Sequence, residues 1–455
     1  MPYTLRSLAM LLVAIGCLSN LSSVCAQSRH EKFDTAGPAL RRQLRSANVD
    51  QRLGALELLR QHPVADSARL VHGCFVDVEE RVRAAAYESL LAMNEEQEVC
   101  DALLSEARAS LQDRHDRQMV LPALAALLAS DLPLARAATQ RFLDEQVAHS
   151  PQGAELLVAL ADQLGLHAQA VDVAPLARMS NARLFVEHFG VRRAVVQALC
   201  KTPPDRSLDP LIGMLGNVGG EAKADAARHL TKVTGQQFGV NVAAWQQWQR
   251  ESRAARVKPQ AKVVPAQLTA TFTRAEELES SSGSYYGMPI FAERLVFVLD
   301  ISGSMREGRL IAAKRELIRT IEGLPSYAHF GVVVFNGGVD RWDRELVPAD
   351  AKHKLSAVQY IKRQSCTGNT ASYDALETAF TYDAEAIYFL SDGAPTSGKI
   401  LAPVDIIQAV TAANHIRRIS IYTIGIAPGF PGSPTDEFLR TLSEKNLGQY
   451  RRIDG

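Results

Sequence analysis

The chain has 455 residues, and 47% of them are hydrophobic, which is enough for two or three domains with substantial cores. Lysine and arginine together number 50, as do aspartate and glutamate, so the formal net charge is zero. This balance gives no electrostatic reason to expect a nucleic-acid partner or an anionic membrane surface.

Residues 1–26 have the pattern of a secretory signal peptide. Arg6 precedes an apolar run over residues 8–17, and a polar stretch then ends in Val24-Cys25-Ala26. The apolar run is too short to span a membrane, so we expect cleavage after Ala26 and export to the periplasm, the cell surface or the medium. An alternative is a loose lipoprotein box at Ala14-Ile15-Gly16-Cys17, which would leave a lipid anchor on Cys17. No other segment is predicted to cross a membrane.

Four cysteines remain outside this segment: Cys74, Cys100, Cys200 and Cys366. Their spacing matches no zinc-binding pattern. In an oxidising compartment a bridge between Cys74 and Cys100 is one alternative, and buried free thiols are the other.

The region from residue 33 to residue 250 repeats a helical pattern. Each unit has a basic residue, a small, β-branched or hydroxyl-bearing residue three positions later, and a leucine four positions after that. The last two members of each trio share one helical face. The trios are Arg52-Ala55-Leu59, Arg83-Ala86-Leu90, Arg136-Thr139-Leu143, Arg192-Val195-Leu199 and Lys223-Ala226-Leu230.

This repetition predicts an all-α solenoid that resembles HEAT repeats, in which stacked helical pairs share a continuous core. A plain antiparallel helical bundle is the alternative. Asn241 is predicted to cap a final helix, on which Trp245 and Trp248 close the end of the core. Residues 251–285, with prolines followed by a serine-rich stretch, are predicted to form a linker.

Residues 286–455 alternate between strand-like and helix-like runs, which predicts an α/β domain with a mostly parallel sheet and helices on both faces. A further run at residues 449–453 is predicted as an edge strand. The predicted strands are Leu295–Leu299, Phe330–Phe335, Ala386–Leu390 and Ile419–Ile426, and the predicted helices are Arg309–Leu324, Ser372–Phe380, Val404–Ile416 and Asp436–Lys445.

Oxygen-bearing side chains follow the first predicted strand at alternate positions: Asp300, Ser302 and Ser304. On a straight strand, residues two apart would be separated by roughly 6.5 Å, whereas the ligands of one Mg2+ lie about 2.1 Å from the ion. The backbone is therefore expected to curl at Gly303, which has no Cβ. Parallel sheets bind ligands at the carboxyl ends of their strands, where Asp300 and also Asp392 are expected to lie.

This segment resembles the first element of the metal-ion-dependent adhesion site (MIDAS) of von Willebrand factor A domains, Asp-x-Ser-x-Ser. The second element of that family is a threonine before a helix, which Thr370 matches, and the third is an aspartate after a later strand, which Asp392 matches. The resemblance covers about the last 165 residues and implies a doubly wound, Rossmann-like fold.

The resemblance further implies that Ser302, Ser304 and Thr370 ligate Mg2+ directly or nearly so, with Mn2+ or Ca2+ as alternatives. Asp300 and Asp392 would act largely through water and through hydrogen bonds to the hydroxyls. Because neutral hydroxyls leave the dication poorly neutralised, an open coordination position could capture a carboxylate from a partner protein.

We therefore expect an exported, Mg2+-dependent adhesion or envelope scaffold protein, with a second protein partner on the helical solenoid. One alternative is a structural or assembly factor whose ion serves only stability. The other is a metal-dependent hydrolase, but no phosphate-binding loop, Gly-x-Ser-x-Gly motif or His-Glu-x-x-His motif is present. We expect that the protein is not an enzyme.

Overall fold

The computed structural model describes residues 27–112, 117–147, 153–166, 173–257 and 283–454. The predicted signal at 1–26, with Cys17, lies outside the described residues, and so does most of the predicted linker at 251–285. The chain divides into two compact units, residues 1–164 with 174–183, and residues 165–173 with 184–455. The helices after residue 184 thus group with the C-terminal sheet, whereas the sequence pattern placed them with the preceding repeats.

The first unit is all-helical, as predicted, and contains the first three repeat trios. Their second and third members are all buried: Ala55, Leu59, Ala86, Leu90, Thr139 and Leu143. Cys74 and Cys100 are free thiols, as are Cys200 and Cys366 in the second unit, so no bridge joins Cys74 to Cys100 in this structure. The helices are α2 (Val49–Leu59), α3 (Ala65–His72), α4 (Glu80–Met93), α5 (Gln97–Gln112), α6 (Arg117–Ala129), α7 (Pro133–Phe142), most of α8 (Gly153–Leu166) and α9 (Ala174–Met179).

Among the described residues of the second unit, five helices precede the sheet. They are α10 (Arg183–Glu187), α11 (Phe189–Cys200), α12 (Pro204–Met214), α13 (Gly220–Thr234) and α14 (Val242–Val257). The predicted cap of α14 is present, because the Asn241 side chain accepts a hydrogen bond from the Ala244 amide at 3.1 Å. Trp245 is fully buried and meets Trp248 edge to face at 6.1 Å between ring centroids. Trp245 therefore closes this end of the helical core, as the sequence predicted.

A mostly parallel sheet forms the centre of the C-terminal domain, in the order β5-β4-β3-β7-β8-β9, with β6 paired to β4. Strands β3, β4, β7, β8 and β9 pair in parallel, while β5 and β6 run antiparallel to β4. A small hairpin of β1 (Ser284–Tyr285) and β2 (Met288–Pro289) precedes the sheet. The strands are β3 (Arg294–Asp300), β4 (His329–Phe335), β5 (Val339–Arg341), β6 (Val347–Pro348), β7 (Ala386–Ser391), β8 (Ser420–Ile426) and β9 (Tyr450–Ile453).

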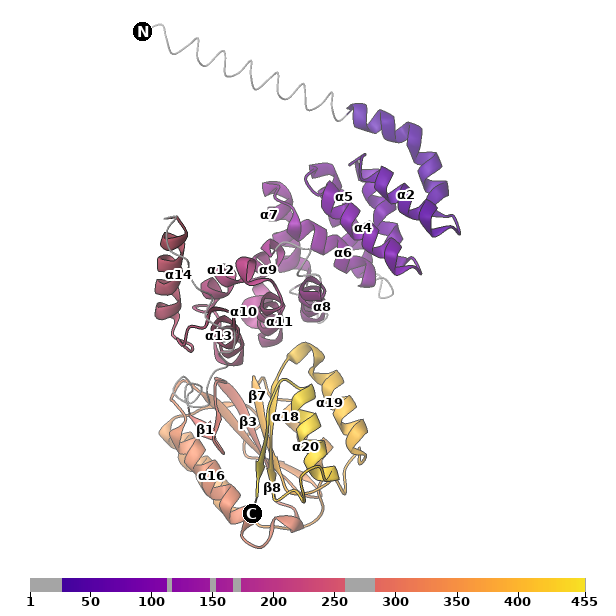
Figure 1. Ribbon diagram of the computed structural model, residues 1–455. Coiled ribbons are helices and arrows are strands. Elements are labelled where there is room, and N and C mark those ends of the chain that lie inside the picture. The colour runs from indigo at the N-terminus through magenta and orange to yellow at the C-terminus, as the bar shows by residue number, and fades with distance from the viewer. Residues whose placement is uncertain (1–26, 113–116, 148–152, 167–172, 258–282, 455) are drawn as a thin grey trace, which may run out of the picture. The chain divides into compact units, whose positions relative to one another are not determined.

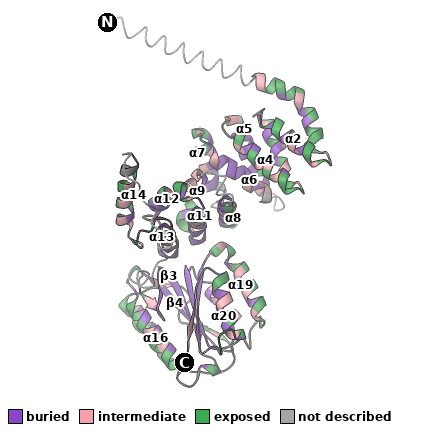
Figure 2. Ribbon diagram, viewed as in Figure 1, coloured by how far each residue is buried: buried purple, intermediate pink, exposed green. Residues whose placement is uncertain are grey.

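Helices cover both faces of this sheet (Figure 1). Helices α16 (Arg309–Gly323) and α17 (Ala351–Arg363) pack on one face, and α18 (Ser372–Ala379), α19 (Pro403–Arg417) and α20 (Pro434–Lys445) pack on the other. Successive strand residues point to opposite faces, so Phe297 joins the first core and Val298 the second. The strands are buried and the outer helix surfaces exposed (Figure 2), which confirms the predicted doubly wound α/β fold.

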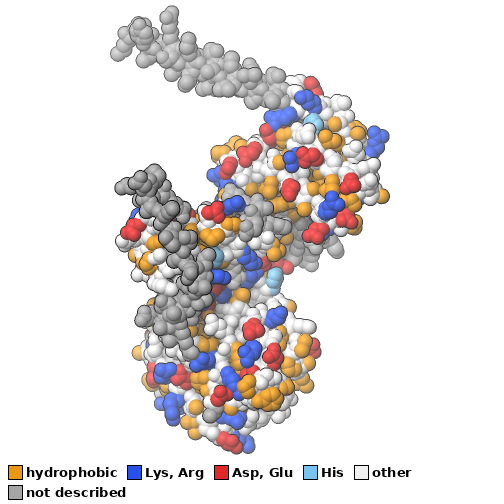
Figure 3. Space-filling model, in the orientation of Figure 1, with side chains coloured by type: hydrophobic (Ala, Val, Ile, Leu, Met, Phe, Trp, Pro, Cys, Tyr) orange, Lys and Arg blue, Asp and Glu red, His pale blue; other side chains and the backbone are white. Residues whose placement is uncertain are grey.

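Each predicted strand and helix of this domain is present, with bounds shifted by one or two residues. Helix α17 and the short strands β5 and β6 were not predicted. On the visible surface of this domain, basic and acidic side chains are intermixed (Figure 3), in keeping with the even charge balance.

Buried charges join α11 and α13 to the amino-terminal end of the sheet; we call this group the polar seam, made of Arg193, Glu221, Asp225, Ser420 and Tyr422. Arg193 is 1% exposed and donates to the Arg418 carbonyl at 2.7 Å, to Ser420 Oγ at 2.8 Å and to Asp225 Oδ2 at 2.8 Å. Glu221 is fully buried and accepts a hydrogen bond from the Tyr422 hydroxyl at 3.0 Å. Pairing and hydrogen bonding of this kind offset the desolvation penalty that each buried charge carries.

Close backbone packing accompanies the polar seam. A Cβ on Gly190 would lie 1.9 Å from the Ile416 carbonyl oxygen, so only glycine allows α11 to approach the end of α19 this closely. Glu385 directly precedes β7 at the same end of the sheet. Its carboxylate accepts a hydrogen bond from the Glu293 amide at 3.2 Å. Helices α11 and α13 are therefore part of the same compact unit as the sheet.

Candidate metal centre

The candidate metal centre lies at the opposite, carboxyl-terminal end of the sheet, where β3 ends at Asp300. After Ile301 and Ser302 the chain turns into a short 3-10 helix, η3 (Gly303–Met305). The Gly303 amide donates to the Gly368 carbonyl at 3.0 Å, and a Cβ on Gly303 would lie only 3.3 Å from that oxygen. The predicted curl is present, and the glycine serves the close approach of two loops rather than a positive φ angle.

Asp300 is completely buried beneath this turn. Its Oδ1 accepts the Ser302 amide at 2.8 Å, and its Oδ2 accepts the Ser391 hydroxyl at 2.5 Å. Burial raises the pKa of the Asp300 carboxyl to about 6, the hydrogen bonds from Ser302 and Ser391 oppose this rise, and the charge of Asp392 adds to it. Asp300 thus holds the turn of β3 against the end of β7.

A chain of hydroxyls connects the same turn to Asp392. Ser302 Oγ and Ser304 Oγ are 3.0 Å apart, and Ser304 Oγ donates to Asp392 Oδ1 at 2.7 Å. The side chain of Asp392 is fully buried, whereas Ser304 is exposed. The donors therefore reach from the protein interior to the surface, so an ion held by them would be accessible from solvent.

Thr370 comes from a third loop, directly before α18, and is 4% exposed. Its amide donates to Thr396 Oγ1 at 2.9 Å, and its carbonyl accepts from the Thr396 amide at 2.9 Å. A Cβ placed on Gly393 would lie 3.5 Å from Ser304 Oγ and 3.9 Å from Thr370 Oγ1. The space beside Gly393 is thus shared by hydroxyls from two different loops.

The structure brings all five predicted positions, Asp300, Ser302, Ser304, Thr370 and Asp392, to one end of the sheet. Their donors are hard oxygen atoms, which suit Mg2+, Mn2+ or Ca2+. Within the described ranges no three His, Cys, Asp or Glu side chains gather as a metal cluster. The donor set therefore fits a hard divalent ion only if the hydroxyls of serine and threonine take part.

Sequence reasoning missed three residues of this centre. Ser391 holds Asp300, Thr396 holds the backbone of Thr370, and Arg309 donates to Asp392 Oδ2 at 2.9 Å. Ser391 directly precedes Asp392, so its hydroxyl could have been suspected at a strand end. The contacts of Thr396 and Arg309 cross between loops, and no sequence spacing indicates them.

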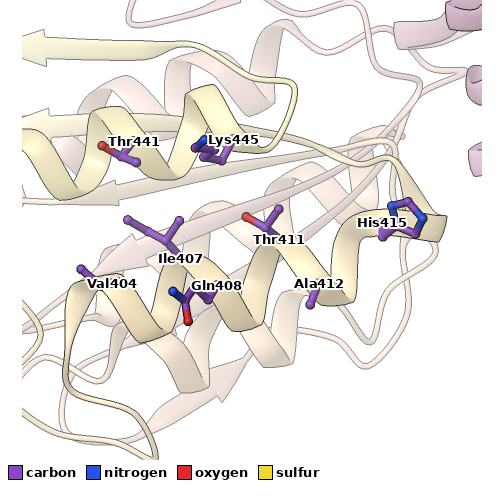
Figure 4. A pocket seen from close by; sticks show the side chains of 8 residues that line it. All are labelled: Val404, Ile407, Gln408, Thr411, Ala412, His415, Thr441 and Lys445. Carbon is purple, nitrogen blue, oxygen red and sulfur yellow. The ribbon is translucent and has the colours of Figure 1, made fainter. Parts of the chain in front are cut away.

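A groove on the helices of this domain lies elsewhere. It has a volume of about 710 Å³ and lies between α19 and α20, where Ile407 and Thr411 of one helix face Thr441 and Lys445 of the other (Figure 4). None of the five predicted metal residues lines it. This groove is therefore separate from the candidate centre, whose residues are buried except for Ser304.

Comparison with known proteins identifies the C-terminal domain. Residues 295–453 match the family model of the von Willebrand factor type A domain, which this part of the chain therefore contains. Among the described helices, none combines the length and the apolar character that crossing a membrane requires.

Curated relatives match over part of the chain. Inter-alpha-trypsin inhibitor heavy chain H2 of Homo sapiens is 28% identical over 204 residues, which covers 40% of this chain and 21% of the relative. Heavy chain H3 of Homo sapiens is 31% identical over 180 residues, covering 37% of this chain and 20% of the relative. The chain thus spans about a fifth of the length of these curated relatives.

Solved structures to which the chain is similar include a von Willebrand factor type A protein from Catenulispora acidiphila. It is 24% identical, has a TM-score of 0.32, and covers 35% of this chain and 38% of its own. The PilB minor pilin from Streptococcus sanguinis is 12% identical with a TM-score of 0.27, covering 36% of this chain and 56% of its own.

Proposed function

We propose that this chain is an exported protein that binds a protein partner through a divalent ion at the A domain, the ion capturing a carboxylate of the partner. The observation that carries the proposal is the state of the two buried carboxylates. Asp300 accepts hydrogen bonds from Ser302 and Ser391, and Asp392 accepts from Ser304 and Arg309. Since both carboxylates are engaged by protein donors, an ion at Ser302, Ser304 and Thr370 would keep much of its positive charge.

Residual charge on the ion favours a carboxylate from outside the protein. Hydroxyl ligands are neutral, and Mg2+ keeps near-ideal octahedral geometry with positions left to water. Ser304, the exposed member of the set, marks the side from which a partner could reach the ion. We propose that the centre binds a divalent ion, and that this ion is Mg2+.

Two alternatives have less support from the same contacts. If the ion served only stability, it would be needed to join the loops, but the hydrogen bonds from Ser304 to Asp392 and from Ser391 to Asp300 already join β3 to β7. A hydrolase would need a general base near the ion. Both nearby carboxylates are already hydrogen-bonded, so we propose binding and not catalysis.

The proposal extends to location and to a second partner. The signal-like pattern at 1–26 supports export, and the resemblance of the A domain to adhesion domains supports an adhesion or scaffold role. In the helical unit, Val76 and Val78 are exposed by 63% and 91% in the segment that follows α3. A protein partner would cover these exposed apolar side chains, so we place the second partner on the helical region.

The test uses the full chain and Mn2+, whose effect on water proton relaxation reports exchangeable waters on the bound ion. We expect one saturable Mn2+ site, displaced by Mg2+, and a fall in relaxation enhancement when acetate replaces a water on the ion. The double variant Ser302→Ala, Ser304→Ala should lose the site, whereas Ser326→Ala, at an exposed serine before β4, should keep it. A folded wild-type chain that binds no ion would refute the proposal, and ion binding without an acetate effect would favour the stability role.

A further inference from the structure

Arg309 is the first residue of α16 and stands beside the candidate metal centre. The amino-terminal end of a helix carries a partial positive charge, which disfavours a cation in the first turn. The residue before it, Gly308, has a left-handed conformation and offers no side-chain cap. An arginine at this position therefore needs a strong acceptor to offset the helix dipole.

The acceptor is Asp392. Arg309 Nη1 donates to Asp392 Oδ2 at 2.9 Å and to the Ser304 carbonyl at 3.2 Å. The Asp392 side chain is fully buried, while that of Arg309 is 34% exposed. Arg309 therefore bridges the turn after β3 and the end of β7, the two segments that carry Ser304 and Asp392.

This contact changes what Asp392 can offer to an ion. Its Oδ1 already accepts the Ser304 hydroxyl at 2.7 Å, so with Arg309 on Oδ2 both carboxylate oxygens have protein donors. The charge of the carboxylate is matched by a guanidinium at hydrogen-bond distance, which attracts it more strongly than a neutral donor would. Each carboxylate oxygen thus has one of its lone pairs occupied and shares its negative charge with a protein donor, so Asp392 is a weaker ligand for an ion than a free carboxylate.

We propose that Arg309 is a positioning residue that sets the ion affinity of the centre: its guanidinium offsets the charge of Asp392 and holds that carboxylate on protein donors. This inference rests on the proposed function and extends it. The ion is then bound less tightly by the protein, and an incoming carboxylate meets an ion whose positive charge Asp392 does not offset. Arg309 therefore lowers the affinity of the centre for the ion and raises the affinity of the bound ion for an anionic group of the partner.

A purely structural ion pair would behave differently. If Arg309 only held the loops in place, its removal would disorder the donors and weaken ion binding. If it sets the charge of the centre, its removal strengthens ion binding, because a like charge has been taken away and Asp392 is released. The direction of the change therefore separates the two roles.

The experiment is calorimetric titration of Mg2+ into the full chain carrying Arg309→Gln, Arg309→Lys or Arg315→Gln. Arg315 is an exposed residue of the same helix, so its substitution removes the same charge away from the centre. We expect Arg309→Gln to bind Mg2+ on the order of tenfold more tightly than the wild type, with a smaller difference at high salt, because salt screens the lost repulsion. Arg309→Lys, which keeps the charge, and Arg315→Gln should stay within about twofold of the wild type.

A second measurement follows acetate binding to the Mn2+-loaded chain by water proton relaxation. Arg309→Gln should bind acetate more weakly than Arg315→Gln, since the negative charge of Asp392 is then no longer offset. Unchanged or weaker Mg2+ binding by Arg309→Gln, with wild-type binding intact, would overturn this inference and leave the proposed function standing. Absence of Mg2+ binding by the wild type and by every variant would overturn both.

Discussion

The two ends of the A-domain sheet differ in how their polar side chains are arranged. At the amino-terminal end, the polar seam buries Arg193 against Asp225 and places Glu221 on the Tyr422 hydroxyl, so charges meet partners inside the protein. At the carboxyl-terminal end, the turn after β3 carries neutral hydroxyls that extend to the exposed Ser304. Buried and paired charges hold helices to the sheet, whereas in the proposed function the hydroxyls near the surface would leave the charge of an ion available to a partner.

This contrast predicts that substitutions at the two ends will affect different quantities. Changes in the polar seam should lower the free energy of unfolding, because a buried charge would lose its partner. Changes among the hydroxyls should lower ion affinity and leave stability nearly unchanged.

The largest effect is expected for Arg193→Met. This change removes one of the donors to Asp225 and the arginine's hydrogen bonds to Ser420 and the Arg418 carbonyl, and a buried pair broken on one side costs about 3–5 kcal/mol. Chemical denaturation followed by circular dichroism measures it. Arg206→Met, at an exposed arginine of α12, is the matched control and should change stability by less than about 0.5 kcal/mol. A loss below about 1 kcal/mol in Arg193→Met would show that the seam is not a stabilising contact.

The next effect depends on pH and concerns Glu385, which is 3% exposed. Burial raises the pKa of its carboxyl from 4.5 to about 7, with further increases from Glu293 and Glu221 and an opposing effect from Arg192. The folded state therefore holds a proton that the unfolded state releases, so stability falls as pH rises from about 4.5 to 7 and is constant above.

Glu385→Gln should remove this dependence, because the amide carbonyl can still accept the Glu293 amide but cannot ionise. The variant should gain stability relative to the wild type between pH 5 and pH 8, by on the order of 3 kcal/mol. Denaturation at several pH values tests this, with Glu444→Gln, at an exposed position of α20, as the control. Parallel stability curves for wild type and Glu385→Gln would contradict the assignment.

A smaller effect is expected from Ser304→Ala at the other end of the sheet. Loss of this hydroxyl should weaken Mg2+ binding about 10- to 100-fold, as does loss of a group that orients metal ligands. The unfolding free energy should fall by about 1 kcal/mol or less, since Ser304 is exposed and water can replace it on Asp392. Titration calorimetry and denaturation on the same preparation separate the two quantities. A large loss of stability with unchanged affinity would reverse the roles assigned to the two ends.

Much of this organisation follows from the sequence alone. The continuous apolar runs predicted the buried strands, and the order of Asp300, Ser302, Ser304, Thr370 and Asp392 at strand ends predicted where the candidate centre lies. These signals are local, because each depends on a strand and the few residues after it. The repeat trios likewise predicted buried helical faces, since helical periodicity is a local property.

Contacts between distant segments could not be predicted in this way. Arg193 is adjacent to Arg192, which the repeat pattern singled out, yet its partners Arg418 and Ser420 are more than 220 residues away. The sequence does not distinguish a buried arginine from a surface arginine, because the residue type alone does not indicate its tertiary contacts. The division of the chain near residue 184 was missed for the same reason.

The polar seam also bears on how this A domain could be moved between proteins. A fragment that begins at the first strand and ends with β9 would contain every residue of the candidate centre, but it would leave Ser420 and Tyr422 facing water without α11 and α13. A transplant into another chain would therefore need to carry the segment from about residue 184 as well. In this protein the A domain is joined to its neighbour by a shared interior, and the natural cutting point for protein engineering lies one hundred residues before the domain's own first strand.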